Sequence, residues 1–330
     1  MLLDHPISEK NNQFDMKDAI LTAHERIRAF IRETPLDYSI YLSHLTGCQV
    51  YFKSENLQYT GSFKIRGALN KLLTLNMEQR SQGVITASSG NHGAAVAFGM
   101  NKLHIAGMVF VPENASKIKV ENIRNYGVPI EFYGNDMMHT ELFAMEYAKR
   151  HKMVYVSPYN DIDVICGQGT IATEIIAQMN QIDAVFIPVG GGGLISGIGS
   201  FLKTVHPHIQ IIGCLPENSP VMAESIKSGH IIEMTTSETI CDATAGGVDP
   251  HTMTLNLCQQ YVDEYILVTE NEIKNAILNV MQMQHQMIEG AAGVALAAFL
   301  KNADRFLNKN IIIILSGANI SFETLKIILS

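Results

Sequence analysis

Short apolar segments alternate with amphipathic segments through the first half of the chain. Strand-length apolar runs occur at residues 84–86, 105–111, 128–133 and 153–156. Between them, apolar residues at helical spacing predict helices that begin near residue 91 and cover 117–126 and 138–151. Because parallel strands need crossover helices, this alternation predicts a parallel sheet with right-handed connections.

A second series of strands and helices fills the rest of the chain. It is predicted as helix 170–179, strand 185–189, helix 194–205, strand 209–213, helices 270–287 and 291–300, and strand 311–315. The last strand is apolar throughout, which is typical of a central parallel strand buried on both faces. Near the N-terminus, Asp15 is predicted to cap a helix that Thr34-Pro35 ends, and a strand follows at 50–52.

The two series indicate an α/β fold with two lobes, each a parallel-type twisted sheet flanked by helices, and a cleft between them. The length of 330 residues supports two lobes, because it exceeds one ordinary domain core. We expect a large domain made of residues 1–80 and 159–330 and a small domain made of residues 81–158.

Composition narrows the functional classes. Hydrophobic residues make up 47% of the chain and charged residues 17%, which is typical of a globular protein. The net charge of -8 and the lack of a Lys/Arg cluster argue against nucleic acid as a partner. No apolar run reaches the length of a membrane span, and Met1–Lys10 lacks the pattern of a secretory leader. The five cysteines form no CxxC pair, so we expect neither zinc nor disulfides, and a cytoplasmic location.

A run of four glycines is the first candidate for chemistry. Gly190, Gly191, Gly192 and Gly193 stand between a predicted strand and a predicted helix. Glycines there let backbone N–H groups close on a phosphate, and the helix N-terminus adds partial positive charge. The alternative is a tight strand-to-helix turn, although one glycine would suffice for that. No Gly-Lys-Ser/Thr ends the run, so it is not a P-loop.

A second glycine motif, at residues 167–172, fits G-x-G-x-x-A only formally. No acidic residue follows it by about 20 positions, where a dinucleotide ribose would need one. We expect it to be a helix start that supports the cleft.

Two further segments contain reactive or polar side chains. Lys64 lies in Ser62-Phe63-Lys64-Ile65-Arg66-Gly67, although a lone lysine is usually a solvated surface group. The segment Ser88-Ser89-Gly90-Asn91-His92-Gly93 directly follows a predicted strand. Polar groups at such a helix N-terminus could hold a carboxylate, or they could be an N-cap with a satisfied histidine.

Together these segments resemble the β-family, or fold type II, of pyridoxal-phosphate enzymes. The matching pieces are SFKIRGA (62–68), SSGNHG (88–93), GQGTIATE (167–174), PVGGGGLISG (188–197) and LSGANI (315–320). Within that family the chain is most similar to the threonine/serine dehydratases and serine racemases, and in particular to bacterial dehydratases that include ectoine-utilisation members. Ile65 and His92 stand where cysteine and threonine synthases usually show Asp and Thr.

The resemblance implies a tryptophan synthase β-like fold, pyridoxal 5'-phosphate as cofactor, and a role for each matching residue. Lys64 would carry the cofactor and take the Cα proton of the substrate. Phe63 would pack near the cofactor ring, Asn91 would bond its ring hydroxyl, and Ser316 would face its pyridine nitrogen. Gly190 to Gly193 would bind its phosphate. The substrate carboxylate would lie on the loop formed by Ser88, Ser89, Gly90, Asn91 and His92.

The implied reaction is the elimination of the β-hydroxyl from L-threonine, L-serine or a related amino acid, which yields a 2-keto acid and ammonia. The alternative is a racemase of serine or hydroxyaspartate, in which Ser89 acts as the second acid–base group. Ser89 could equally be a hydroxyl of the carboxylate loop. One departure is Ala318, since relatives usually read SGGN there.

The resemblance also carries expectations about metal and assembly. Metal-activated serine racemases place carboxylates where this chain has Leu215 and Val221, so we expect no magnesium or calcium site. We expect a homodimer that acts on a small amino-acid substrate.

Overall fold

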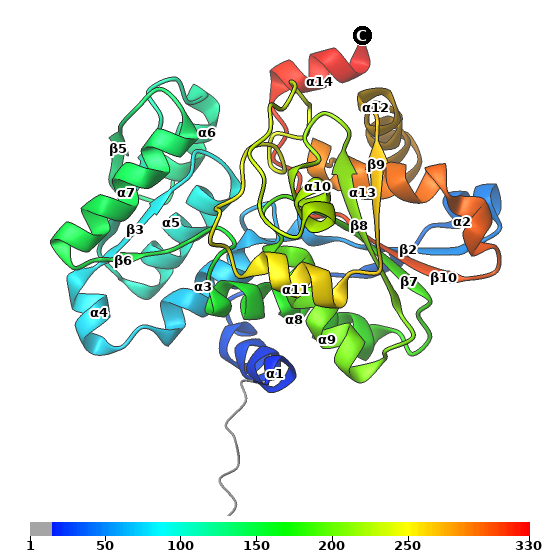
Figure 1. Ribbon diagram of the computed structural model, residues 1–330, viewed down its shortest axis with the longest axis horizontal. Coiled ribbons are helices and arrows are strands. Elements are labelled where there is room, and N and C mark those ends of the chain that lie inside the picture. Colours follow the sequence, from blue (N-terminus) through cyan, green and yellow to red (C-terminus); the bar gives the residue numbers. More distant parts are fainter. Residues whose placement is uncertain (1–14) are drawn as a thin grey trace, which may run out of the picture.

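The computed structural model describes residues 15–330 and contains two sheets that lie side by side (Figure 1). Met1–Lys10, the basis of the leader argument, lies outside the described residues. The six-stranded sheet has the order β1-β2-β10-β7-β8-β9, and the four-stranded sheet has the order β5-β4-β3-β6. The fold is therefore α/β, as the sequence predicts.

The six-stranded sheet is built from both halves of the chain. Its strands are β1 (Leu36–Tyr38), β2 (Gln49–Lys53), β7 (Ala184–Pro188), β8 (Gln210–Pro216), β9 (Glu264–Val268) and β10 (Asn310–Ile314). All neighbouring pairs are parallel except β1 with β2. Strand β10 lies between β2 and β7, where Ile311 is opposite Val50 on one side and Ala184 on the other. Its residues Ile311 to Ile314 are fully buried, which confirms the prediction of a central strand.

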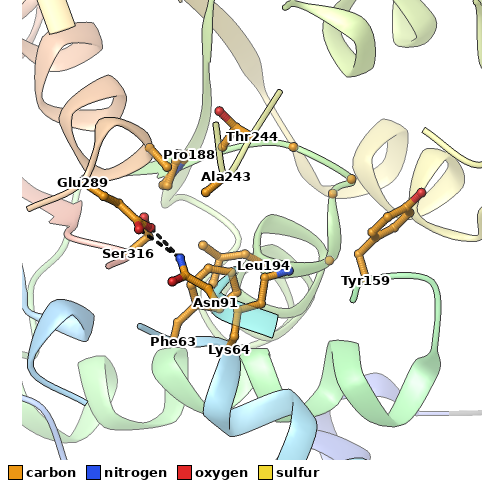
Figure 2. Close-up of a pocket in the computed structure, with 15 residues that line it drawn as sticks. Phe63, Lys64, Asn91, Tyr159, Pro188, Leu194, Ala243, Thr244, Glu289 and Ser316 are labelled. Carbon is orange, nitrogen blue, oxygen red and sulfur yellow. Dashed lines mark hydrogen bonds between the residues drawn. The ribbon is translucent and has the colours of Figure 1, made fainter. Parts of the chain in front are cut away.

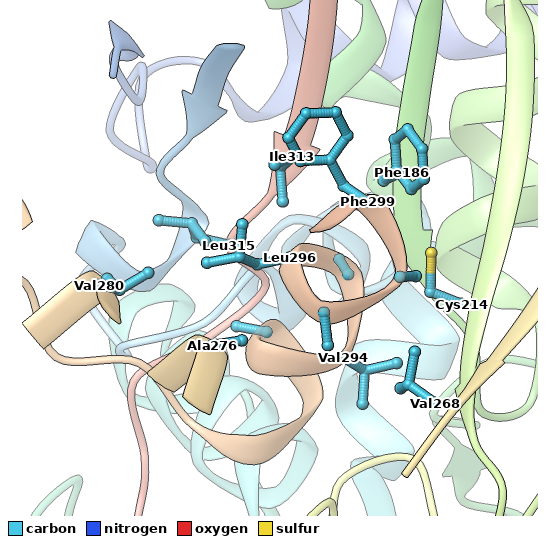
Figure 3. Packing of buried hydrophobic residues seen from close by; sticks show 14 of the residues in the cluster. Phe186, Cys214, Val268, Ala276, Val280, Val294, Leu296, Phe299, Ile313 and Leu315 are labelled. Carbon is cyan, nitrogen blue, oxygen red and sulfur yellow. The ribbon is translucent and has the colours of Figure 1, made fainter. Parts of the chain in front are cut away.

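Helices cover both faces of this sheet. α13 (Gly290–Lys301) and α12 (Glu270–Asn279) lie on one face, and α8 (Ile162–Gln178), α9 (Gly193–Val205) and α1 (Met16–Ile27) lie on the other. Figure 3 shows Phe299 of α13 against Phe186 of β7, with ring centroids 5.5 Å apart. Successive strand residues enter opposite cores, since Ile313 packs toward α13 and Ile312 toward α9.

The four-stranded sheet is all parallel and comes from one continuous stretch. Its strands are β3 (Val84–Ala87), β4 (Gly107–Val111), β5 (Ile130–Phe132) and β6 (Val154–Tyr155). α5 (Asn91–Leu103) and α6 (Lys117–Arg124) pack on one face, and α7 (Met137–His151) packs on the other. These four strands all lie between residues 84 and 155; the exact domain boundaries near 80 and 158 stay a prediction.

The predicted helix start at Gly167 is wrong. Gly167 and Gly169 lie in the interior of α8, which begins five residues earlier at Ile162. The reason is packing, because an added Cβ on Gly167 would lie 2.6 Å from the carbonyl oxygen of Arg66. One added on Gly197 of α9 would lie 2.6 Å from the amide nitrogen of Gly169. The glycines thus let two helices approach the backbone of α8 closely.

Other elements differ in their ends or were not predicted. α1 ends at Ile27, before Thr34-Pro35, and α12 gives way to the π-helical turn η2 (Val280–Gln284). The unpredicted elements are β1, β9, α2 (Ile40–Thr46), η1 (Glu55–Leu57), α3 (Lys64–Thr74), α4 (Met77–Gln82), α10 (Val221–Ser228), α11 (Thr254–Tyr261), η3 (Ala303–Phe306) and α14 (Phe322–Leu329). Within residues 15–330, no helix is both long and apolar enough to cross a membrane.

Candidate active site

A cavity lies between the two sheets, where several element ends meet (Figure 2). The residues that line it are Phe63, Lys64, Asn91, Tyr159, Pro188, Gly190, Gly191, Gly192, Gly193, Leu194, Ala243, Thr244, Glu289, Ala291 and Ser316. The glycines follow β7 and Ser316 follows β10, so the carboxyl ends of two paired strands open into the cavity. Ligands of open α/β sheets bind at such strand ends.

Lys64 is the first residue of α3, and its amino group has an unusual environment. The Nζ atom donates a 2.8 Å hydrogen bond to the carbonyl oxygen of Pro158. Burial lowers the pKa of Lys64 from 10.5 to about 8, although Glu289 and Glu141 act in the opposite direction. A neutral amine is therefore accessible near physiological pH, and it can act as a nucleophile or a base.

A buried ion cluster holds the helix that carries Lys64. Arg66, two residues further on, donates to Glu55 at 2.8 Å and to Glu174 at 2.6 Å. Lys53 Nζ also donates to Glu174, at 2.6 Å. All four side chains are buried, and their charges are mutually compensated. The cluster therefore ties the start of α3 to β2 and α8.

The glycine loop leaves no room for side chains. An added Cβ on Gly191 would lie 2.4 Å from the Cγ atom of Tyr159, and one on Gly190 would lie 3.1 Å from the Cα atom of Thr244. Gly192 has a φ of 84°, in the left-handed region that favours glycine. Among residues 15–330, no side chain caps the N-terminus of α9, which begins at Gly193. Backbone N–H groups at this end of the cavity are thus available to an anion.

The opposite end of the cavity contains a polar atom that lacks a partner. The Ser316 hydroxyl is 1% exposed and finds no hydrogen-bond partner among the described residues. An orphaned buried hydroxyl is costly unless a ligand satisfies it. A phosphate cradle at one end, a hydroxyl that can bond a ring nitrogen at the other and a low-pKa lysine between them fit pyridoxal phosphate.

Asn91 reaches the cavity from the small sheet and bonds a buried carboxyl. Its Nδ2 atom donates to both oxygens of Glu289, at 2.8 and 3.0 Å (Figure 2). Its Oδ1 atom accepts from Asn319 at 2.6 Å. Burial raises the pKa of Glu289 to about 7.

The structure brings together eight of the predicted site residues: Phe63, Lys64, Asn91, Gly190, Gly191, Gly192, Gly193 and Ser316. Of the proposed carboxylate loop, only Asn91 is among the lining residues of the described chain; Ser88, Ser89, Gly90 and His92 are not. The His92 ring is buried with Nε2 2.9 Å from the carbonyl oxygen of Val156. Burial and nearby Lys64 lower the pKa of His92 to about 3, so the ring is neutral. The substrate-binding roles stay a prediction.

Several lining residues were not predicted as site residues. Glu289 is preceded by no obvious motif, although the small residues Gly290 to Gly293 that follow it are typical of close packing. Tyr159 accepts a 2.9 Å hydrogen bond from the amide of Asp249 through its hydroxyl. Thr244 lies in a long irregular segment after α10, where no hydrophobic period exists to guide prediction.

The loop considered for a metal ion contains no pair of carboxylates. Leu215 and Val221 are both buried, and the Glu217 carboxylate lies 3.5 Å from Lys301. Across the described part of the chain, no group of three or more His, Cys, Asp or Glu side chains is placed to hold a metal. The expectation that the loop binds no magnesium or calcium ion stays a prediction.

Known proteins resemble this chain over almost its whole length. A catabolic L-threonine dehydratase from Staphylococcus aureus (strain USA300) is 41% identical over 298 residues, which cover 89% of this chain and 86% of that relative. The processed form of threonine deaminase isoform 2 from Solanum lycopersicum matches with a TM-score of 0.92 at 34% identity, over 98% of this chain and 88% of that one. Maize serine racemase matches with a TM-score of 0.88 at 32% identity, over 95% of this chain and 96% of that one.

The family assignment follows from these likenesses and from the cavity. The family model described as pyridoxal-phosphate dependent enzyme matches residues 27–317, which include every residue that lines the cavity. The chain belongs to the pyridoxal-phosphate dependent enzyme family.

Proposed function

We propose that this enzyme eliminates the β-hydroxyl of L-threonine, L-serine or a related amino acid, and so releases a 2-keto acid and ammonia. The observation that carries the proposal is the position of Lys64. Its low-pKa amine lies in a cavity bounded by the glycine loop and by Ser316. The dehydratase and deaminase names of the relatives from Staphylococcus aureus and Solanum lycopersicum support the substrate class.

Pyridoxal phosphate, when bound, supplies an electron sink for the charge that develops at the substrate Cα atom. The chain itself performs the proton chemistry. Lys64 would hold the cofactor and, as a free amine, would remove the Cα proton of the substrate. The lowered pKa of Lys64 suits this role, because a base works best when its pKa is near the operating pH.

The other cavity residues would hold and orient the cofactor. The backbone N–H groups of Gly190 to Gly193 would bind the phosphate, and Phe63 would pack near the ring. Asn91 would bond the ring oxygen, and Ser316 would bond the pyridine nitrogen. A neutral hydroxyl at Ser316 stabilises a positive ring nitrogen less than a carboxylate would, which favours rapid loss of the β-hydroxyl.

The substrate loop lies at the N-terminus of α5. We assign the substrate carboxylate to the stretch from Ser88 to His92, where backbone N–H groups and the helix dipole favour an anion. The small domain, residues 81–158, would then contribute the substrate loop, and the large domain most of the cofactor site. Asn91 belongs to both functions.

The decisive experiment is a substrate screen with two products measured together. Purified enzyme with pyridoxal phosphate should release ammonia and keto acid in equal amounts from L-threonine, L-serine or a hydroxyaspartate. Chiral chromatography of the remaining substrate tests the racemase alternative, which the likeness to maize serine racemase favours. If none of these substrates releases ammonia while the configuration of one of them is inverted, the dehydratase proposal is overturned.

Ser89 separates the two candidates at residue level. If it is the second acid–base group, Ser89→Ala abolishes racemisation and spares elimination from L-substrates. Equal loss of both activities would leave Ser89 as a binding group.

We also propose that the enzyme is a cytoplasmic homodimer. The five buried cysteine thiols, none of them in a disulfide, suit a reducing compartment. Sedimentation equilibrium of the full chain tests the dimer, and a single species at the 36.4 kDa monomer mass would refute it.

A further inference from the structure

Three side chains from three segments form a continuous hydrogen-bonded chain beside the cavity. Asn319 Nδ2 donates to the Thr60 carbonyl oxygen at 2.9 Å and to Asn91 Oδ1 at 2.6 Å. Asn91 Nδ2 in turn donates to both carboxyl oxygens of Glu289. Asn91 comes from the start of α5, while Asn319 and Glu289 come from the segments after β10 and before α13.

The chemistry of these partners allows one orientation of the Asn91 amide. An ionised carboxylate only accepts hydrogen bonds, so it must face the Nδ2 group. The Asn319 nitrogen that contacts Asn91 also contacts the Thr60 carbonyl oxygen, which can only accept, so it is a donor and must face Oδ1. Amide orientation is assigned from such networks, and here both neighbours of Asn91 require the same one.

The Glu289 side chain is itself firmly placed. Glu289 occupies the N-cap position of α13, yet within residues 15–330 its carboxylate makes no capping bond to that helix. It points into the cavity instead (Figure 2). Its backbone N–H donates to the Gly317 carbonyl oxygen at 2.9 Å, and an added Cβ on Gly317 would lie 2.4 Å from Glu289 Oε1. The Glu289 carboxylate is only 3% exposed and does not cap the adjacent helix. Because burying a carboxylate is costly, its position indicates another role.

We propose that Glu289 is a positioning residue that fixes the Asn91 amide, so that its N–H group rather than its oxygen is presented to the ring oxygen of pyridoxal phosphate. The inference rests on the proposed cofactor role of Asn91. An amide turned the other way would place Oδ1 against an electron-rich ring oxygen, and the two would repel.

Protonation of Glu289 weakens this constraint. A neutral carboxyl group carries an O–H that can donate to Asn91 Oδ1, so Glu289 then accepts either amide orientation and only Asn319 still requires one of them. The charged groups that act on Glu289 are Lys119 on α6, Asp242 in the segment after α10, and Lys64 on α3. With the pKa of Glu289 near 7, the constraint is strongest above neutral pH.

The test is a double-mutant cycle on the cofactor-free protein. The probe is pyridoxine phosphate, which lacks the aldehyde and therefore binds without a bond to Lys64. We expect Asn91→Ala and Glu289→Gln each to weaken its binding by about tenfold, measured by calorimetry. In the Asn91→Ala background, Glu289→Gln should have little further effect, because it acts through Asn91. Wild-type affinity should also fall as pH drops through about 7, and Glu289→Gln should flatten that profile.

Controls separate this inference from the proposed function. Glu141→Gln removes another carboxyl group that influences Lys64, and its effect should add to that of Asn91→Ala. If Asn91→Ala binds the probe like wild type, the cofactor role of Asn91 is wrong. If Asn91→Ala weakens binding but Glu289→Gln does not, or if the two effects add, the positioning role is overturned. Should Glu289→Gln fold poorly, the same cycle is run with Asn319→Ala, which removes the other hydrogen-bonding neighbour of Asn91.

Discussion

The Lys64 amino group donates a 2.8 Å hydrogen bond to the carbonyl oxygen of Pro158, 94 residues further along the chain. Pro158 lies just after β6, the last strand of the small sheet, whereas Lys64 begins a helix that follows β2 of the large sheet. The reactive amine is thus held by a contact between segments that follow different sheets.

The lowered pKa of Lys64 predicts how the cofactor-free protein captures pyridoxal phosphate. Only the neutral amine attacks the aldehyde, and its fraction rises with pH. With a pKa of about 8 the neutral fraction rises about tenfold between pH 7 and pH 9. The initial rate of capture, followed by absorbance, should show that midpoint; a midpoint near 10.5 would contradict the buried environment.

Lys64→Ala should abolish turnover without unfolding the protein, because the role of the side chain is chemical. Loss of its acid–base contribution alone predicts a rate at least about 10²–10⁴-fold lower. Ammonia release measures the rate, and circular dichroism checks the fold. Lys203→Ala, on the far end of α9, is a suitable control and should keep normal activity.

Gly191→Ala should block cofactor binding, because the added methyl group would collide with the Tyr159 ring. Gly247→Ala is the matched control, since an added Cβ there meets nothing within 4 Å. Equilibrium dialysis with pyridoxal phosphate distinguishes the two variants. Normal retention by the Gly191 variant would show that the loop adapts and that its shape is not set by Tyr159.

Arg66→Leu should destabilise the protein strongly. It would remove the ion-pair partner of the buried Glu55 and leave the buried Glu174 paired with Lys53 alone. Breaking a buried ion pair in this way costs about 3–5 kcal/mol. Arg305→Leu removes an exposed pair with Glu264 and should cost at most about 1 kcal/mol. The unfolding midpoints, compared at one heating rate, should rank the variants in that order.

Elimination should be insensitive to chelators. The loop at 215–221 offers buried Leu215 and Val221 where metal-activated relatives are expected to have carboxylates. Assay after exhaustive EDTA treatment, with and without added magnesium, measures the effect. A several-fold loss of rate that magnesium restores would show a metal site that residues 215–221 do not reveal.

Periodic hydrophobicity was enough to predict most of the strands. The run Ile311 to Ile314 reads as a buried central strand, and the structure places it there. α3, which carries Lys64, was missed although its buried apolar residues Ile65, Ala68, Leu69 and Leu72 recur at helical spacing. The charged Arg66 and the polar Asn70 are buried beside them.

The residues of the candidate site also differ in how far the sequence alone reveals them. The glycine loop follows an apolar strand, so local sequence pattern is sufficient to find it, whereas Ser316 was found through the resemblance to the family. Glu289 could not be found, because its importance comes from contact with Asn91, 198 residues away. Such a pair becomes visible only when the chain is folded.

The position of β10 has a consequence for synthesis on the ribosome. The small sheet, β3 to β6, is complete once residue 155 has emerged, and it can pair its strands at once. The large sheet cannot, since β2 and β7 have no contact until β10 is inserted between them. About 260 residues separate β2 from that partner. For most of translation, β2 therefore presents an open strand edge, and a stalled chain that stops before residue 310 would be prone to pair with other chains.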